Sequence, residues 1–286
     1  MKRKINQLVS DYNRGRIGRR EFTKKMAVLA GATTASAGII SLAGSCTGKS
    51  GRENTELENG FITYPGHTGD VRAYLSVPDG KKKYPAVIII HENRGLVPHI
   101  MDVNRRMAGE GFLALAPDAL SPLGGTPEDD PDRGRTLIGQ LDREDTVKDF
   151  VAAVKYLKTH PRSTGKVGCT GFCWGGGMTN QVAVNAPDLD AAAPYYGAQP
   201  DPAEVPKIKA PVMAHYAGDD ARINAGIEAF EEALKKAGIE YQIFIYEGAK
   251  HAFNNDSNPD RYHPEAARLA WERTVQFFKE KLGEEK

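Results

Sequence analysis

Cys173 is the residue of this 286-residue chain whose surroundings best suit covalent chemistry. Gly171 and Gly175 flank it at a separation of two residues, after an apolar run at 166–170 and before a helix-prone stretch at 178–185. Glycines on both sides allow a sharp strand-to-helix turn that lifts one side chain above the sheet, which is called a nucleophile elbow. The N-terminus of the following helix is expected to favour thiolate over thiol. The alternative interpretation is an ordinary buried cysteine in a glycine-rich turn.

A carboxylate and a histidine follow Cys173 at the ends of two later strand-like runs. Asp219 and Asp220 come after the first run, and His251 comes after the second, just before the last helical stretch. This is the order nucleophile, acid, histidine that α/β-hydrolases use for acyl transfer. Taken singly, the aspartates could form a solvated turn and His251 could be a loop residue. Their joint placement predicts a triad of Cys173, His251 and one of these two aspartates.

The elements that would position these residues alternate between strands and helices. Apolar or alternating runs predict strands at residues 61–64, 71–77, 86–90, 112–116, 166–170, 191–196, 211–216 and 241–246. Helical patterns occur at residues 98–110, 142–160, 178–185, 223–237 and 264–282, and a long loop is expected at 118–135. The first two strands should form a hairpin, and Gly238 should cap a helix. The sequence therefore predicts an α/β fold with a mostly parallel sheet covered on both faces.

Composition and charge restrict the function classes. The chain is 40% hydrophobic and 26% charged, with a formal net charge of +1, which is ordinary for a soluble globular protein. Residues 1–45 hold nine Lys/Arg and two Asp/Glu, so the remainder carries 29 basic and 35 acidic side chains. No basic face suggests nucleic acid. No Cys/His spacing suggests a metal, and no glycine-rich loop carries the Lys-Ser/Thr pair of a phosphate site, so no cofactor is expected.

The first 46 residues resemble an export signal. Arg19 and Arg20, with Phe22 two places later, resemble a twin-arginine motif. A mildly apolar stretch at 26–44 follows, and it ends near Cys46 in a sequence that resembles a lipoprotein processing box. Cleavage nearby without lipidation, or a basic tail on a cytosolic protein, are the alternatives. We expect handling by the twin-arginine export machinery and an exported protein, periplasmic or membrane-anchored through Cys46, with residues 47–59 as a polar linker.

Four segments together resemble the dienelactone hydrolase family, which has the α/β-hydrolase fold. These segments cover residues 91–95, 171–176, 217–220 and 248–253, within a likeness that spans roughly residues 60–284. Family members are esterases that act on dienelactone, or relatives whose substrate is unsettled. The resemblance implies a hydrolase of small esters or lactones whose catalytic domain is 60–286. It implies that Cys173 is the nucleophile, that His251 is the base and that Asp220 is the acid that orients it, so that Asp219 should face solvent or cap the turn. It also implies that Glu92 pairs with the resting thiol, and that the backbone N–H groups of Asn93 and Trp174 form the oxyanion hole.

One departure from the family pattern affects the expected substrate. Family members hold the substrate carboxylate with two arginines, one of them four residues after the catalytic histidine, and here that position is Asn255. The other arginine would be Arg133 or Arg135, neither of which aligns cleanly. A general small-ester or lactone hydrolase is therefore the better expectation than an enzyme for an anionic lactone. A non-catalytic, exported binding or scaffold protein on the same fold is the alternative from another class, and an ester assay separates the two.

Overall fold

A computed structural model describes Lys25 and residues 58–80 and 82–283 of the chain. The described residues from Glu58 onward belong to one compact unit. The expected export signal and Cys46 lie outside the described residues, apart from Lys25. Strand β1 (Glu58–Pro65) begins one residue before the predicted end of the polar linker at residue 59.

The folded unit is built on one eight-stranded sheet in the order β1-β2-β4-β3-β5-β6-β7-β8. Strands β1 and β2 form the predicted antiparallel hairpin, β2 also pairs antiparallel with β4, and the remaining neighbours are parallel. The other strands are β2 (Asp70–Val77), β3 (Tyr84–Ile90), β4 (Leu113–Pro117), β5 (Ser163–Phe172), β6 (Ala191–Tyr195), β7 (Val212–Asp219) and β8 (Tyr241–Lys250). The mostly parallel α/β-hydrolase fold expected from the sequence is confirmed.

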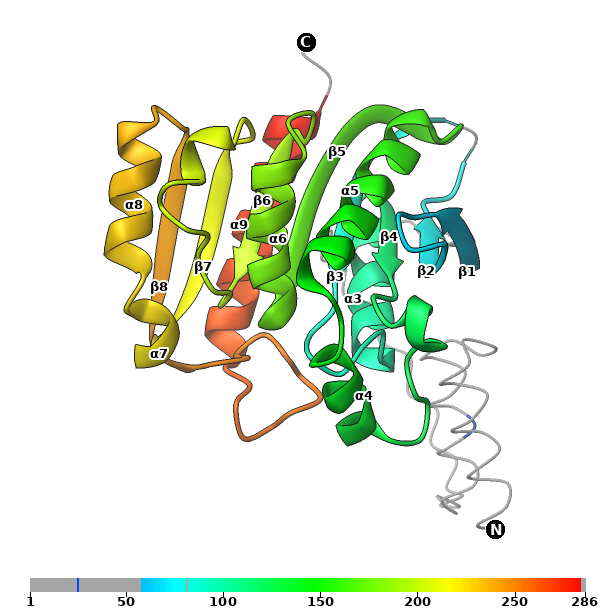
Figure 1. Ribbon diagram of the computed structural model, residues 1–286, viewed down its shortest axis with the longest axis horizontal. Coiled ribbons are helices and arrows are strands. Elements are labelled where there is room, and N and C mark those ends of the chain that lie inside the picture. Colours follow the sequence, from blue (N-terminus) through cyan, green and yellow to red (C-terminus); the bar gives the residue numbers. More distant parts are fainter. Residues whose placement is uncertain (1–24, 26–57, 81, 284–286) are drawn as a thin grey trace, which may run out of the picture. The chain divides into compact units, whose positions relative to one another are not determined.

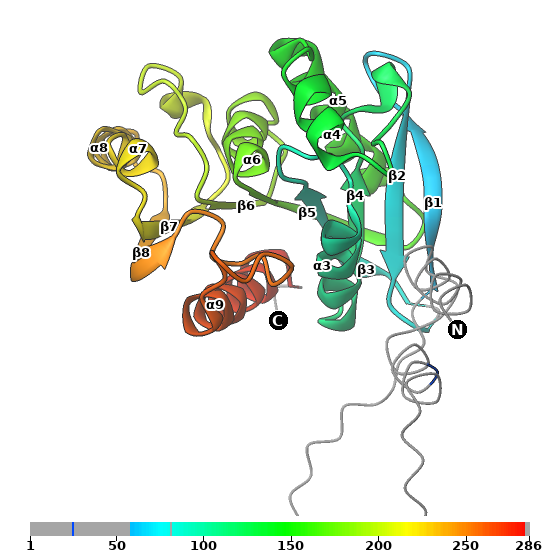
Figure 2. The same cartoon turned by 90° about the horizontal axis from the view of Figure 1, so that it is seen from below.

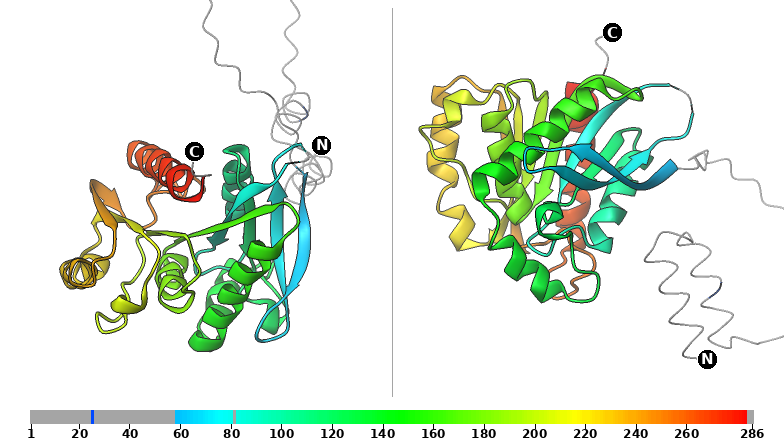
Figure 3. Two further views of the ribbon diagram at one scale, coloured as in Figure 1. Left: turned by 90° about the horizontal axis from the view of Figure 1, so that it is seen from above. Right: turned by 45° about the vertical axis from the view of Figure 1, so that its right-hand side comes forward.

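Helices cover both faces of this sheet (Figure 2). Helices α3 (Pro98–Gly109) and α9 (Pro264–Leu282) lie on one face, and α5 (Arg143–Thr159), α6 (Trp174–Asn185) and α8 (Ile227–Lys236) lie on the other, as Figure 3 also shows. Strand β3 explains why both faces need a cover. Val87 and Ile89 enter the core under α3 and α9, whereas Ile88 and Ile90 enter the opposite core. Burial on both faces is why this strand reads as a continuous apolar run.

Two segments differ from the sequence prediction. The expected loop at 118–135 contains a short 3₁₀ turn (Ser121–Leu123) and the start of helix α4 (Pro131–Ile138). The Asp130 side chain begins α4 by accepting the backbone N–H groups of Asp132 and Arg133, a local cap that the Pro- and Asp-rich composition concealed. The helix expected at 223–237 is divided into α7 (Ala221–Asn224) and α8, with Gly226 at the junction. Gly238 has the left-handed φ of +67° expected of a helix-ending glycine.

The remaining elements complete the scaffold. A second 3₁₀ turn covers Val205–Lys207. None of the helices among the described residues is both long and apolar enough to cross a membrane.

Candidate active site

Cys173 occupies the sharp turn between β5 and α6, as the elbow prediction requires. Its backbone has φ 58° and ψ −115°, a left-handed conformation that costs free energy for any residue with a side chain. Both flanking glycines are sterically required: a Cβ at Gly171 would collide with the carbonyl of Gly175, and one at Gly175 with the carbonyl of His91. The local sequence therefore permits a backbone path that forces the thiol out of the strand direction.

The two aspartates after β7 have different surroundings. Asp220 is buried, and its Oδ2 accepts a 2.5 Å hydrogen bond from His251 Nδ1–H. Its other oxygen lies 3.5 Å from the backbone N of Ile223, so Asp220 also begins α7. Asp219 is exposed at the end of β7. Because Nδ1 is engaged by the carboxylate, the second ring nitrogen of His251 is the one left for an outside partner.

The side chains meet because each follows the carboxyl end of a parallel strand. Cys173 follows β5, Asp220 follows β7 and His251 follows β8, and helices α4 and α7 lie toward this end of the sheet (Figure 1). Ends of parallel strands share one edge, where open α/β folds place their ligand sites. Cys173 and His251 line a cavity of about 490 Å³ at this edge, together with Asn93, Trp174 and Tyr196.

The Cys173 thiol is a weak acid in this setting, contrary to the sequence prediction. Burial, followed by the charge of Glu92, raises the pKa of Cys173 to about 11. The backbone N–H of Trp174 at the start of α6 and the positive charge of Arg222 lower this pKa, but they do not offset the first two effects. The helix N-terminus acts in the expected direction. Burial destabilises the thiolate by more free energy than the helix N-terminus contributes to its stability, so the resting group is a thiol.

Glu92 lies two residues after the end of β3, and only one of its carboxylate oxygens has a hydrogen-bond partner among the described residues. Oε2 accepts a 2.7 Å hydrogen bond from Asn255 Nδ2. Oε1 is buried and has no hydrogen-bond partner among the described residues. The family resemblance implies that Glu92 pairs with the thiol. Here the charge of Glu92 raises the pKa of Cys173, while its hydrogen bond is accepted from Asn255. Asn255, which stands where the family pattern has an arginine, therefore holds the Glu92 carboxylate in place.

His91 fixes the backbone on which Glu92 and Asn93 sit. It is fully buried, its Nδ1–H donates to the Glu92 carbonyl (2.6 Å), and its Nε2 accepts the Ala119 N–H (3.1 Å). Its ring stacks on Trp174 with the centroids 5.3 Å apart. Burial lowers the pKa of His91, so the neutral ring that these two bonds require is the favoured form. One buried histidine therefore binds the Glu92 carbonyl, next to Asn93, and packs against the ring of Trp174.

Three arginines give the cavity its charge. Arg135 is one of the two arginines singled out in the sequence, and it lines the cavity, whereas Arg133 is not among the lining residues. Arg143 and Arg222 also line it and were missed. No aspartate or glutamate is among the lining residues. Arg222 stands two places after Asp220, so its position beside the expected acid was the one available signal in the sequence.

Cys169 and Cys173, the two described cysteines, are both free thiols. Cys169 is fully buried in β5, and its Sγ lies 3.8 Å from Thr179 Oγ1. Cys173 is partly exposed to the cavity. A disulfide between them would require the turn at residues 171–173 to unfold.

This combination of fold and strand-end site defines an α/β-hydrolase. The model of the dienelactone hydrolase family matches residues 71–282. A proposed carboxymethylenebutenolidase of Saccharolobus solfataricus is 33% identical over 255 residues, covering 76% of this chain and 97% of that protein. The protein usf of Aquifex pyrophilus is 38% identical over 228 residues, covering 74% of this chain and 94% of its own length.

A solved structure agrees with these relatives. A proposed dienelactone hydrolase from Klebsiella pneumoniae superposes with a TM-score of 0.70 at 29% identity, covering 78% of this chain and 98% of that one. The chain belongs to the dienelactone hydrolase family. It is a hydrolase that resembles the carboxymethylenebutenolidases. This family membership favours an enzyme over the non-catalytic binding or scaffold protein that was the alternative in the sequence analysis.

Proposed function

We propose that this protein hydrolyses small esters or lactones through a Cys173–His251–Asp220 triad and a thioester acyl-enzyme. The observation that carries the proposal is the 2.5 Å contact between the buried Asp220 and His251, which lines the same cavity as Cys173. A carboxylate on Nδ1 leaves Nε2 as the base facing that cavity. The neutral resting thiol fits a nucleophile whose proton is removed during attack.

The reaction begins when His251 takes the Cys173 proton as Sγ attacks the ester carbonyl. The carbonyl oxygen becomes an oxyanion, for which the backbone N–H groups of Asn93 and Trp174 are the proposed donors. Comparable donors are worth about 10²–10³ in rate each. The imidazolium then protonates the leaving alkoxide or enolate, and the acyl group remains as a thioester. Water, deprotonated by His251, releases the acid and restores the thiol.

The cavity charge indicates which esters are favoured. Arg135, Arg143 and Arg222 line it without an acidic neighbour among the lining residues, so an ester with an anionic group gains a charge-assisted contact that a neutral ester lacks. We propose that these arginines replace the family arginine whose position Asn255 occupies. Binding of an anionic group then depends on a different set of side chains, while Asn255 holds Glu92.

The experiment that tests hydrolysis is an ester and lactone screen with purified protein, which includes acetate esters of good leaving groups and carboxylated lactones. Cys173→Ala is the negative control, and circular dichroism checks that it folds. Turnover by the wild type that disappears in Cys173→Ala supports the triad. A wild type without activity across the screen, or an active Cys173→Ala, would contradict it.

We also propose that the protein is exported by the twin-arginine machinery, periplasmic or anchored through Cys46. The motif at Arg19 and Arg20 precedes the family match, which begins at residue 71. The twin substitution Arg19→Lys, Arg20→Lys should leave uncleaved precursor in the cytoplasm, because the arginine pair is the recognised feature. Fractionation with immunoblotting measures this. Full-length active protein in the cytoplasm of cells that carry the unaltered gene would refute export.

A further inference from the structure

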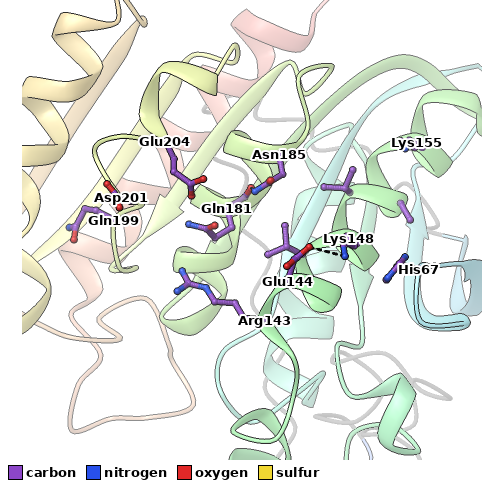
Figure 4. A pocket seen from close by; sticks show the side chains of 14 residues that line it. His67, Arg143, Glu144, Lys148, Lys155, Gln181, Asn185, Gln199, Asp201 and Glu204 are labelled. Carbon is purple, nitrogen blue, oxygen red and sulfur yellow. Dashed lines mark hydrogen bonds and ion pairs between the residues drawn. The ribbon is translucent and has the colours of Figure 1, made fainter.

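A second hollow adjoins the catalytic cavity on the side of α5 and α6. This groove has a volume of about 860 Å³ and is lined from α5, from α6 and from the segment after β6 (Figure 4). Residues of α5 and α6 form its walls, and Gln199, Asp201 and Glu204 close one end. We call this hollow the outer groove. The polar residues that line it, labelled in Figure 4, are His67, Arg143, Glu144, Lys148, Lys155, Gln181, Asn185, Gln199, Asp201 and Glu204.

The outer groove continues from the catalytic cavity along three segments. Arg143, at the start of α5, lines both. On α6, Met178 lines the cavity and Gln181, one turn later, lines the groove. After β6, Ala198 lines the cavity and the next residue, Gln199, lines the groove. A ligand whose reacting carbonyl lies at Cys173 can therefore extend past Arg143 into the outer groove without leaving the protein surface.

The charges of the outer groove are balanced in number, and some of them are paired. Lys148 pairs with Glu144 (2.9 Å) and also with Asp145 (3.3 Å). Glu204 pairs with Lys207 (2.8 Å) outside the lining. The lining contains three Lys/Arg and three Asp/Glu side chains. This balance differs from the arginine-lined catalytic cavity, so the outer groove suits an uncharged ligand.

Amide groups supply the hydrogen bonding of the outer groove. Gln181 and Asn185 project from one face of α6, and Gln199 stands at the end of the groove (Figure 4). Asn185 uses one N–H on the Gln181 carbonyl, and Gln199 uses one on the Ile223 carbonyl, and these bonds fix both side chains. A planar amide offers a donor beside an acceptor, which matches neighbouring hydroxyls, each of them both donor and acceptor.

Apolar contact in the outer groove is narrow. Val147, Val151 and Ala152 provide it along α5, and no Phe, Tyr or Trp is among the lining residues. A long acyl chain would require a more extended apolar floor. An extended peptide would require a free strand edge for its backbone, and this wall consists of helices and loop.

We propose that the outer groove binds the polyhydroxylated, uncharged alcohol portion of the ester, as in an O-acetylated sugar. This inference rests on the proposed hydrolysis at Cys173. It adds that the leaving group is a polyol held by Gln181, Asn185 and Gln199, with its esterified oxygen next to His251.

The test compares two substrates in one enzyme. The probes are 4-nitrophenyl acetate, which fills only the cavity, and an O-acetylated disaccharide, which reaches the outer groove. In the double variant Gln181→Ala, Asn185→Ala, kcat/KM for the acetylated disaccharide should fall about 5–30-fold, mainly through KM, because two hydrogen bonds are lost. Turnover of 4-nitrophenyl acetate should stay within twofold. Gln242→Ala, an exposed amide on β8, is the matched control and should change neither.

The outcomes separate this inference from hydrolysis itself. If the wild type cleaves 4-nitrophenyl acetate but not the acetylated disaccharide, the polyol assignment is wrong while hydrolysis stands. Equal loss on both substrates would also overturn it, because the variant would then have disturbed the cavity. If esters with long acyl chains show the selective loss instead, the occupant is apolar and the inference fails. Absence of activity on every ester would overturn the proposed function as well.

Discussion

Cys169 and Cys173 stand four residues apart on one strand-and-turn segment, yet only one is placed for chemistry. Burial raises the pKa of both thiols, to about 12 for Cys169 and about 11 for Cys173. Cys169 lies in the extended part of β5 and packs in the core beside Thr179. Cys173 lies one residue beyond the strand, in a left-handed conformation that turns it into the cavity. Acidity barely distinguishes the two thiols.

The difference shows that access and a neighbouring base make the candidate nucleophile. His251 shares the cavity with Cys173, and Asp220 orients its ring. Glu92 acts in the opposite sense, because its charge keeps the thiol protonated. In an oxidising compartment such as the proposed periplasm, a thiol that ionises only during attack is less exposed to oxidation than a resting thiolate.

Replacing each cysteine in turn gives the largest expected contrast. Cys173→Ala should lower kcat for an activated ester by on the order of 10⁵, since loss of a nucleophile removes covalent catalysis. Cys169→Ala should keep kcat within about twofold and lower the melting temperature by a few degrees, because it removes only a packed sulfur atom. Steady-state kinetics and thermal denaturation measure these effects. A reversed ranking of the two kcat values would contradict the contrast.

The two aspartates extend the comparison to the base. Asp220→Asn should lower kcat by up to about 10⁴, because an amide cannot hold the imidazole in the required tautomer. The loss can be smaller than in a serine enzyme, since a thiol needs less help from its base. Asp219→Asn, at an exposed position, should cost at most about tenfold. Measuring kcat of both variants on one ester tests this assignment. A large loss of kcat in Asp219→Asn, with a nearly normal kcat in Asp220→Asn, would show that Asp219 is the triad acid.

Glu92→Gln should separate thiol acidity from catalysis. Removing the negative charge lowers the pKa of Cys173 from its raised value, so more thiolate is present at any pH below that pKa. Alkylation by iodoacetamide at pH 8 should therefore become about 3–10 times faster, and its midpoint should move to lower pH. Mass spectrometry can follow Cys173 and Cys169 together, and Cys169 should not change. An unchanged or slower reaction at Cys173 would show that Glu92 does not suppress the thiolate.

Arg222→Ala tests the charge of the cavity. With a carboxylated ester, kcat/KM should fall about tenfold through loss of a charge-assisted contact, and with a neutral ester of equal size it should change less than threefold. The same variant removes a positive charge that lowers the Cys173 pKa, so both substrates share that minor effect. Arg133→Ala, outside the cavity lining, is the control. Equal loss on both esters would assign Arg222 to the thiol instead of the substrate.

The sequence by itself determined the fold class and the candidate site. Glycines on both sides of Cys173 permit few backbone paths, and the ends of alternating strands meet at one edge by topology. Asp220 and His251 could therefore be placed together although 31 positions separate them. Helix α9 was predicted with its observed bounds, because its amphipathic pattern and its start at Pro264 are local properties.

Only the tertiary structure decided how the thiol is tuned and what lines the cavity. The pKa of Cys173 depends on the burial of the turn and on the charge of Glu92, which follows β3. No local sequence pattern encodes this balance of desolvation and charge. Arg143 and Arg222 reach the same cavity from α5 and α7, and Asn255 meets Glu92 across 163 positions. Such contacts depend on how helices and loops pack over the sheet edge. Packing is set by the whole chain, whereas strand order and turn geometry follow from short segments.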